Sequence, residues 1–143
     1  QNKNQIWKTI VKIKPLQFSN NSRRFYVDKI CVTEQDVNIL ASDRNYELNI
    51  EIFIDNIIHF QITDESYKVK FSEYLFENKE KNDWDRNPAI NYFFEIIDDS
   101  YMDWLKEESF DFFEKKYYKA YIFFFSDSVI DVISSTEPVF YSK

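Results

Sequence analysis

His59 is the only histidine in the chain and Cys31 is the only cysteine, so they are the first candidates for proton transfer and nucleophilic attack. In the strand register favoured below, His59 lies opposite Glu51. This pair could transfer a proton, but no nucleophile can be tied to it by spacing, and we favour an exposed cross-strand pair. Cys31 has no identifiable base, so we expect a buried structural thiol. We therefore predict no catalytic residue and no enzyme activity.

Metal and cofactor sites also lack the residues that they require. One histidine and one cysteine cannot supply the ligand spacing of a zinc site. The acidic segments Asp83–Trp84–Asp85 and Asp98–Asp99 lack the spaced ligands and the glycine of an EF-hand loop. The chain contains no glycine, which excludes the Gly-rich dinucleotide fingerprint, the P-loop and the nucleophile elbow. We predict no metal and no cofactor.

Acidic residues follow a helical spacing after Ser100, which suits an N-cap. They recur every three or four residues from Asp103 to Glu114, so a helix would align them into one acidic ridge, although like charges at this spacing cost about 0.2–0.5 kcal/mol per pair. The ridge is either a solvated face or a surface for a basic partner. The second interpretation predicts a partner-binding surface that combines these acids with nearby ones and an aromatic anchor: Asp83, Trp84, Asp85, Asp98, Asp99, Asp103, Glu107, Asp111 and Glu114.

Length and charge limit the class of protein. A chain of 143 residues suits one domain over residues 1–143. The 25 acids and 18 bases give a net charge of −7, which argues against a nucleic-acid partner and fits either a basic protein partner or simple solubility. No apolar run approaches 18 residues and no signal peptide is visible, so we expect no membrane partner. A lone cysteine suits a reducing compartment, and we expect a cytoplasmic protein.

Alternating and helical patterns predict the elements that carry these residues. Thr33–Arg44 is ambiguous, because Thr33 and Asp36 resemble a helix N-cap while Val37, Ile39 and Ala41 alternate; we favour a short strand or turn. The clearer segments are strands at Trp7–Ile13 (ended by Pro15), Arg24–Val32 and Ile90–Ile97, and a helix at Glu65–Glu77.

The clearest alternation runs from Tyr46 to Ile62 and predicts a β-hairpin. A two-residue turn would put His59 on the apolar face. A three-residue turn, Ile54–Asp55–Asn56, instead places Asn56 in the left-handed conformation, which asparagine tolerates where glycine is missing. We favour this register, which pairs Ile52 with Ile58, Ile50 with Phe60 and Leu48 with Ile62.

A second hairpin is predicted for Lys119–Phe125 and Val129–Ser134, across Ser126–Asp127–Ser128. The first strand is apolar on both faces, so it is either a central strand covered on both sides or a strand with one exposed binding face. The patterns together predict an α+β fold, with a mainly antiparallel β-sheet and one or two helices packed on it.

Two segments resemble small immunity proteins of bacterial polymorphic toxin systems of the contact-dependent, Rhs and Wap types. They are Tyr46–Ser66 (YELNIEIFIDNIIHFQITDES) and Ser100–Phe140, which contains SYMDWLKEES and YIFFFSDSVIDVISSTEPVF. Together they cover under half the chain, and neither is a catalytic signature. The resemblance implies a cytoplasmic inhibitor that binds a cognate toxin domain, often a nuclease. It transfers no specific binding residue.

We therefore predict an immunity protein that binds and neutralises a cognate toxin with a basic domain through an acidic, aromatic surface. The alternative is a small-ligand or carbohydrate-binding domain that uses exposed aromatic residues such as Trp84. An enzyme that uses His59 and carboxylates ranks last, because no nucleophile, base and orienting group can be named together.

Overall fold

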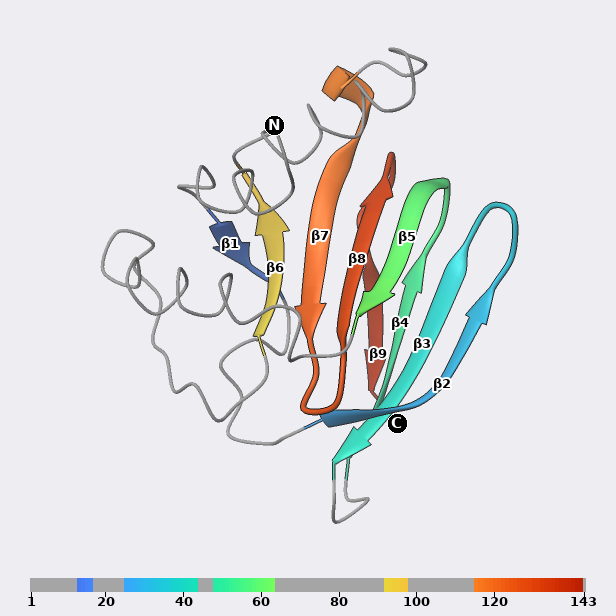
Figure 1. The fold of residues 1–143 in the computed structure, drawn as a ribbon, viewed down its shortest axis with the longest axis vertical. Coiled ribbons are helices and arrows are strands. Elements are labelled where there is room, and N and C mark those ends of the chain that lie inside the picture. Colours follow the sequence, from blue (N-terminus) through green and yellow to red (C-terminus); the bar gives the residue numbers. More distant parts are fainter. Residues whose placement is uncertain (1–12, 17–24, 44–47, 64–91, 98–114, 143) are drawn as a thin grey trace.

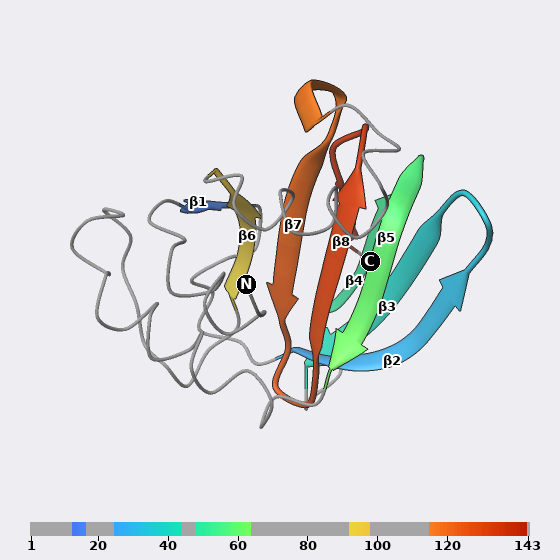
Figure 2. The same cartoon turned by 45° about the horizontal axis from the view of Figure 1, so that its top comes forward.

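The computed structural model describes residues 13–16, 25–43, 48–63, 92–97 and 115–142. Figure 1 shows them as two layers of antiparallel strands, and the turned view in Figure 2 shows the two layers packed face to face. Strands make up 71% of the described residues and helix 3%, so this part of the chain is an all-β sandwich. Within it, no helix is long and apolar enough to cross a membrane.

Within the described residues, the larger sheet has five strands in the order β1-β6-β7-β8-β5, and the smaller sheet has four in the order β2-β3-β4-β9. The five-stranded sheet consists of β1 (Ile13–Pro15), β6 (Tyr92–Ile96), β7 (Lys119–Phe124), β8 (Val129–Ser134) and β5 (Ile57–Thr63). The four-stranded sheet consists of β2 (Phe25–Val32), β3 (Val37–Asp43), β4 (Asn49–Ile54) and β9 (Val139–Ser142). A short 3-10 helix, η2 (Lys115–Tyr117), precedes β7.

The prediction of an α+β fold with helices packed on one sheet is wrong. The inner face of each sheet is covered by the other sheet, and one core cluster joins Phe25 and Ile52 of the smaller sheet to Phe123 of the larger. Alternation in a strand marks a buried face but does not say which element buries it. The helices predicted at Glu65–Glu77 and from Ser100 onward lie outside the described residues.

The segment from β4 to β5 does not form the predicted β-hairpin. Ile50 and Ile52 are buried as the alternation predicts, and Asn56 has the expected positive φ of 51°. However, β4 pairs with β3 and β9, whereas β5 pairs with β8. The turn therefore carries the chain from one sheet to the other, and none of the pairs predicted between β4 and β5, including Leu48 with Ile62, forms.

A polar latch, formed by Ser134, Thr136 and the Asp55 carbonyl, joins this turn to the segment that follows β8. The buried Ser134 hydroxyl donates a hydrogen bond to the Asp55 carbonyl, and Thr136 Oγ1 donates to the same oxygen at 2.8 Å. Thr136 N donates to Ser134 Oγ at 2.9 Å, and Ser135 N donates to the Asn56 carbonyl at 3.3 Å. The chain crosses from one sheet to the other between β4 and β5, and again between β8 and β9. The latch joins these two connections by hydrogen bonds.

Several predicted strands are confirmed. Strands β2 and β6 lie within the predicted ranges at Arg24–Val32 and Ile90–Ile97, and β7 and β8 form the predicted hairpin, with Phe124 opposite Val129. Strand β7 lies between β6 and β8, and residues 120–123 are buried. Of the two interpretations of this strand, the covered central strand is confirmed.

The ambiguous segment after β2 is a turn followed by a strand. Thr33 Oγ1 accepts hydrogen bonds from Gln35 N at 3.1 Å and Asp36 N at 3.0 Å, which is the bonding expected of a helix N-cap. The chain nevertheless continues into β3 with Val37 and Ile39 buried. The same side-chain bonds close a tight turn as readily as they begin a helix.

Candidate functional site

The outer face of the four-stranded sheet exposes side chains of its two edge strands, β2 and β9. Its side chains alternate with the buried core residues of the same strands, so they point away from the other sheet. We name this surface the open face and define it by two cross-strand rows. These rows are Cys31, Asn38, Phe53 and Val139, and Lys29, Leu40, Glu51 and Tyr141.

Apolar side chains dominate one side of the open face. Tyr141 and Val139 on β9 are 50% and 47% exposed, and Phe53 and Leu40 are half-buried beside them. Four strands spaced by about 4.8 Å give a surface about 14 Å wide. Aromatic side chains that are partly exposed in a broad surface are typical of protein–protein contacts.

A hydrogen-bonded pair lies in the middle of the open face. Asn38 Nδ2 donates to Glu51 Oε2 at 2.7 Å, diagonally across β3 and β4, and both side chains are half-buried. The bond orients the Glu51 carboxylate on the open face. A carboxylate held in this way beside Tyr141 can accept a hydrogen bond or ion pair from a basic partner.

The outer face of the five-stranded sheet is different, because it is buried. Phe94, Ile122 and Ile133 are each 0% exposed, and Ile96 is 4% exposed. Asp131 lies on this face opposite Ile122 and is 1% exposed. Around β6, β7 and β8 this face is part of the interior, and its described side chains there form no broad contact surface.

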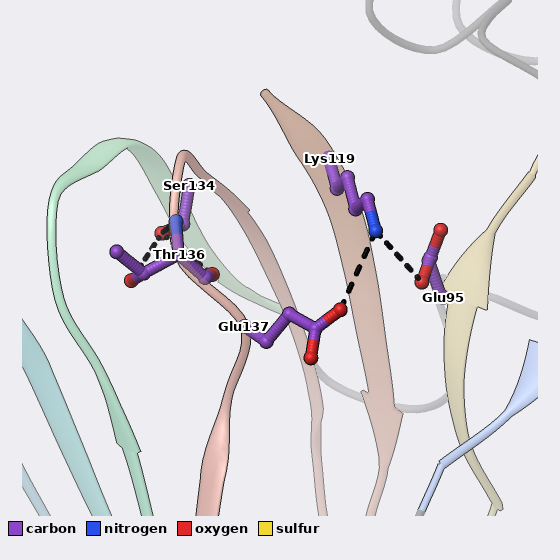
Figure 3. A network of polar contacts seen from close by, with 5 residues as sticks. All are labelled: Glu95, Lys119, Ser134, Thr136 and Glu137. Atoms are coloured by element: carbon purple, nitrogen blue, oxygen red, sulfur yellow. Dashed lines mark hydrogen bonds and ion pairs between the residues drawn. The ribbon is translucent and has the colours of Figure 1, made fainter. Parts of the chain in front are cut away.

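A charged cluster lies at one end of the sandwich. Lys119 Nζ lies 3.4 Å from Glu137 Oε1 and 3.9 Å from Glu95 Oε1, so one ammonium group bridges β6 and the segment before β9 (Figure 3). The Glu95 side chain is 13% exposed and that of Glu137 is 76% exposed. An exposed ion pair contributes little to stability, so the Glu95 contact is the more important of the two.

Tyr121 lies in the core near this cluster. Its pKa is raised well above the ordinary value, first because burial disfavours the phenolate and then because Glu95 and Glu137 carry negative charge nearby. The phenol therefore keeps its proton at neutral pH and cannot act there as a base. No described residue forms a hydrogen bond with its hydroxyl.

The structure corrects the two candidates for chemistry. His59 is not opposite Glu51: it pairs with Ile133 in the five-stranded sheet, while Glu51 lies in the other sheet. The error follows from the predicted hairpin, since two strands in different sheets cannot be cross-strand neighbours. Cys31 is exposed rather than buried, because it lies on an outward position of the edge strand β2.

The predicted partner-binding residues Asp83, Trp84, Asp85, Asp98, Asp99, Asp103, Glu107, Asp111 and Glu114 all lie outside the described residues. The open face was not predicted as a site. Its signal was present in the alternation of β4, where Glu51 and Phe53 occupy the outward positions of a strand with a fully apolar inner side. Nothing in the sequence placed β9 beside them.

Comparisons with family models, with curated proteins and with solved structures each give no match for this chain. Within the described residues, no group of three or more histidine, cysteine, aspartate or glutamate side chains is placed to hold a metal ion. The geometry of the described residues is therefore the basis of the functional proposal.

Proposed function

We propose that this chain is an immunity protein that binds and neutralises a cognate bacterial toxin domain, and that the open face forms part of the contact. The observation that carries the proposal is the open face itself, where exposed Tyr141 and Val139 adjoin Phe53 and the oriented Glu51 carboxylate. Apolar anchors around a desolvated polar contact are typical of binding surfaces. The proposed activity is binding, without catalysis or a cofactor, in the cytoplasm.

The charge of the chain supports a basic partner. A net charge of −7 attracts a basic domain over long range and speeds association, while specific contacts determine how long the complex lasts. A toxin that acts on nucleic acid needs a basic active site to hold phosphates. An acidic inhibitor seated over such a site would exclude the substrate and neutralise the same charges.

Growth rescue and complex formation test the proposal together. The proposal expects a large toxin gene directly upstream, and co-expression with the C-terminal domain of that toxin should restore growth and yield a stable complex. Failure of both would overturn it. A ligand-induced melting shift, with no protein partner recovered, would instead support the small-ligand alternative.

The predicted acidic surface has its own test within the same complex. Charge reversal at Glu107 and Asp111 should slow association and weaken its dependence on salt, because long-range attraction is screened by ions. Unchanged association kinetics would remove these two residues from the interface, and the open face would remain to be tested separately.

A further inference from the structure

The open face carries one carboxylate and one ammonium group, at separate places in the same cross-strand row. Among the residues that define this face, only Glu51 and Lys29 are charged. They lie on β4 and β2, with Leu40 of β3 between them, which is a separation of about 10 Å at the usual strand spacing. No ion pair joins Lys29 to Glu51. The negative charge of the open face is therefore separate from its positive charge and lies on the side of β9.

The Glu51 carboxylate is held in place on this face. Asn38 Nδ2 donates to Glu51 Oε2 at 2.7 Å, and both side chains are half-buried. A bond from a neutral amide orients a carboxylate without removing its charge. Because an ionised carboxylate accepts about four hydrogen bonds, Glu51 can receive donors from a partner while it keeps its bonds within the chain. Partial burial strengthens such a contact, since the surroundings of the charge are less polar than water.

An exposed aromatic ring lies beside this carboxylate. Tyr141 of β9 is the cross-strand neighbour of Glu51 and is 50% exposed. The Cβ atoms of such neighbours are about 4.5–5.5 Å apart, so one ligand group can contact both side chains. A guanidinium group fits this combination, because it forms parallel hydrogen bonds to a carboxylate and stacks its flat face on an aromatic ring. An ammonium group can form the ion pair but has no flat face to stack.

We propose that Glu51 and Tyr141 form a binding site for the guanidinium group of an arginine side chain, and that the toxin domain supplies this arginine. The source of the arginine rests on the proposed function, whereas the site rests on the geometry of the open face. A net charge of −7 attracts basic surfaces to this chain. Arginine is also enriched among the residues that contribute most to binding at protein interfaces, so one arginine on the toxin suffices to anchor the contact at this site.

A titration of the full chain with amino-acid derivatives tests the site without the toxin. The probes are the N-acetyl amides of arginine, lysine and citrulline, each up to about 100 mM at matched ionic strength, and the readout is the backbone amide signals in NMR spectra. Citrulline has the shape of arginine without its charge. We expect the arginine probe to shift the amide signals of Glu51 and Tyr141, with lysine binding about threefold more weakly or less and citrulline weaker still. Equal binding of arginine and lysine, or no shift with arginine, would overturn the proposal.

Two pairs of variants assign the response to the two side chains. Glu51→Gln removes the charge but keeps an oxygen that can accept the bond from Asn38, and the shifts with arginine should be lost. Glu34→Gln is the matched control, because it removes the same charge from an exposed residue in the turn between β2 and β3, outside the open face, and it should respond as wild type does. Tyr141→Phe should keep the preference for arginine, whereas Tyr141→Leu should bind arginine and lysine alike. A folded Glu51→Gln that still prefers arginine would overturn the proposal.

The same variants separate this inference from the proposed function. In the complex with the toxin domain, Glu51→Gln should raise the dissociation constant about tenfold or more, and Glu34→Gln should raise it less than about twofold. A complex that is unaffected by Glu51→Gln would overturn the inference and leave the proposed function standing. A chain that prefers the arginine probe, but neither rescues growth nor binds the toxin domain, would overturn the proposed function and with it the toxin as the source of the arginine.

Discussion

The outer faces of the two sheets differ although both sheets share one core. On the five-stranded sheet, Phe94 and Ile122 are buried on the outer side as fully as Phe123 is on the inner side. On the outer side of the four-stranded sheet, Tyr141 is exposed and Phe53 is half-buried. A sheet buried on both faces is structural, whereas a sheet with one open, partly apolar face is available to a partner.

The largest expected effect compares a phenylalanine on each outer face. Phe94→Ala should lower the free energy of unfolding by about 3–5 kcal/mol, because it leaves a cavity in a fully buried layer. Phe53→Ala on the open face should cost about 1 kcal/mol, since that side chain is half-buried. Urea unfolding followed by tryptophan fluorescence measures both. Equal losses in the free energy of unfolding would show that the two outer faces contribute equally to the stability of the fold.

The polar latch gives an intermediate effect on the connection between the two sheets. Ser134→Ala should cost about 1–3 kcal/mol, because the Asp55 carbonyl loses one of its two donors and Thr136 N loses its acceptor. Ser135→Ala is the control and should change stability by less than about 0.5 kcal/mol, since Ser135 is exposed and its described bond is made by the backbone. If both substitutions had the same effect, the hydroxyl of Ser134 would not be what stabilises the polar latch.

A smaller effect concerns Tyr121, which lies in the core between the two faces. Its pKa is higher in the folded chain than the ordinary value of 10.0, so the folded state holds the phenol proton more tightly than the unfolded state. The free energy of unfolding should therefore fall as the pH rises above 10. Tyr121→Phe removes this proton and should make the decline shallower. Melting temperatures of both proteins between about pH 9 and 12 check this, and an unchanged slope would contradict it.

Several strands of this fold were predictable because alternation is a local property. The buried positions of β4, the left-handed Asn56 and the apolar β7 all follow from neighbouring residues. The assignment of strands to sheets is not local. A turn such as Asp55–Asn56 can close a hairpin or cross between sheets with the same inward side chains, and only long-range contacts such as the latch decide between them.

The candidate site was harder to predict for the same reason. Glu51 and Phe53 were recognisable as outward positions, but their contacts come from β3 and β9, which are distant in sequence or ambiguous in pattern. The predicted pairing of His59 with Glu51 failed because it depended on the sheet assignment. The acidic surface predicted after Ser100 lies outside the described residues and stays a prediction.

The affinity for the toxin domain of two tyrosine variants tests the central claim most directly. Tyr141 is 50% exposed on the open face, and Tyr117 is 62% exposed on η2, away from that face. Tyr141→Ala should weaken the complex at least tenfold, or by about 1.4 kcal/mol, while Tyr117→Ala should leave the dissociation constant unchanged. An unchanged affinity for Tyr141→Ala, or a loss confined to Tyr117→Ala, would contradict the assignment of the open face as the binding surface.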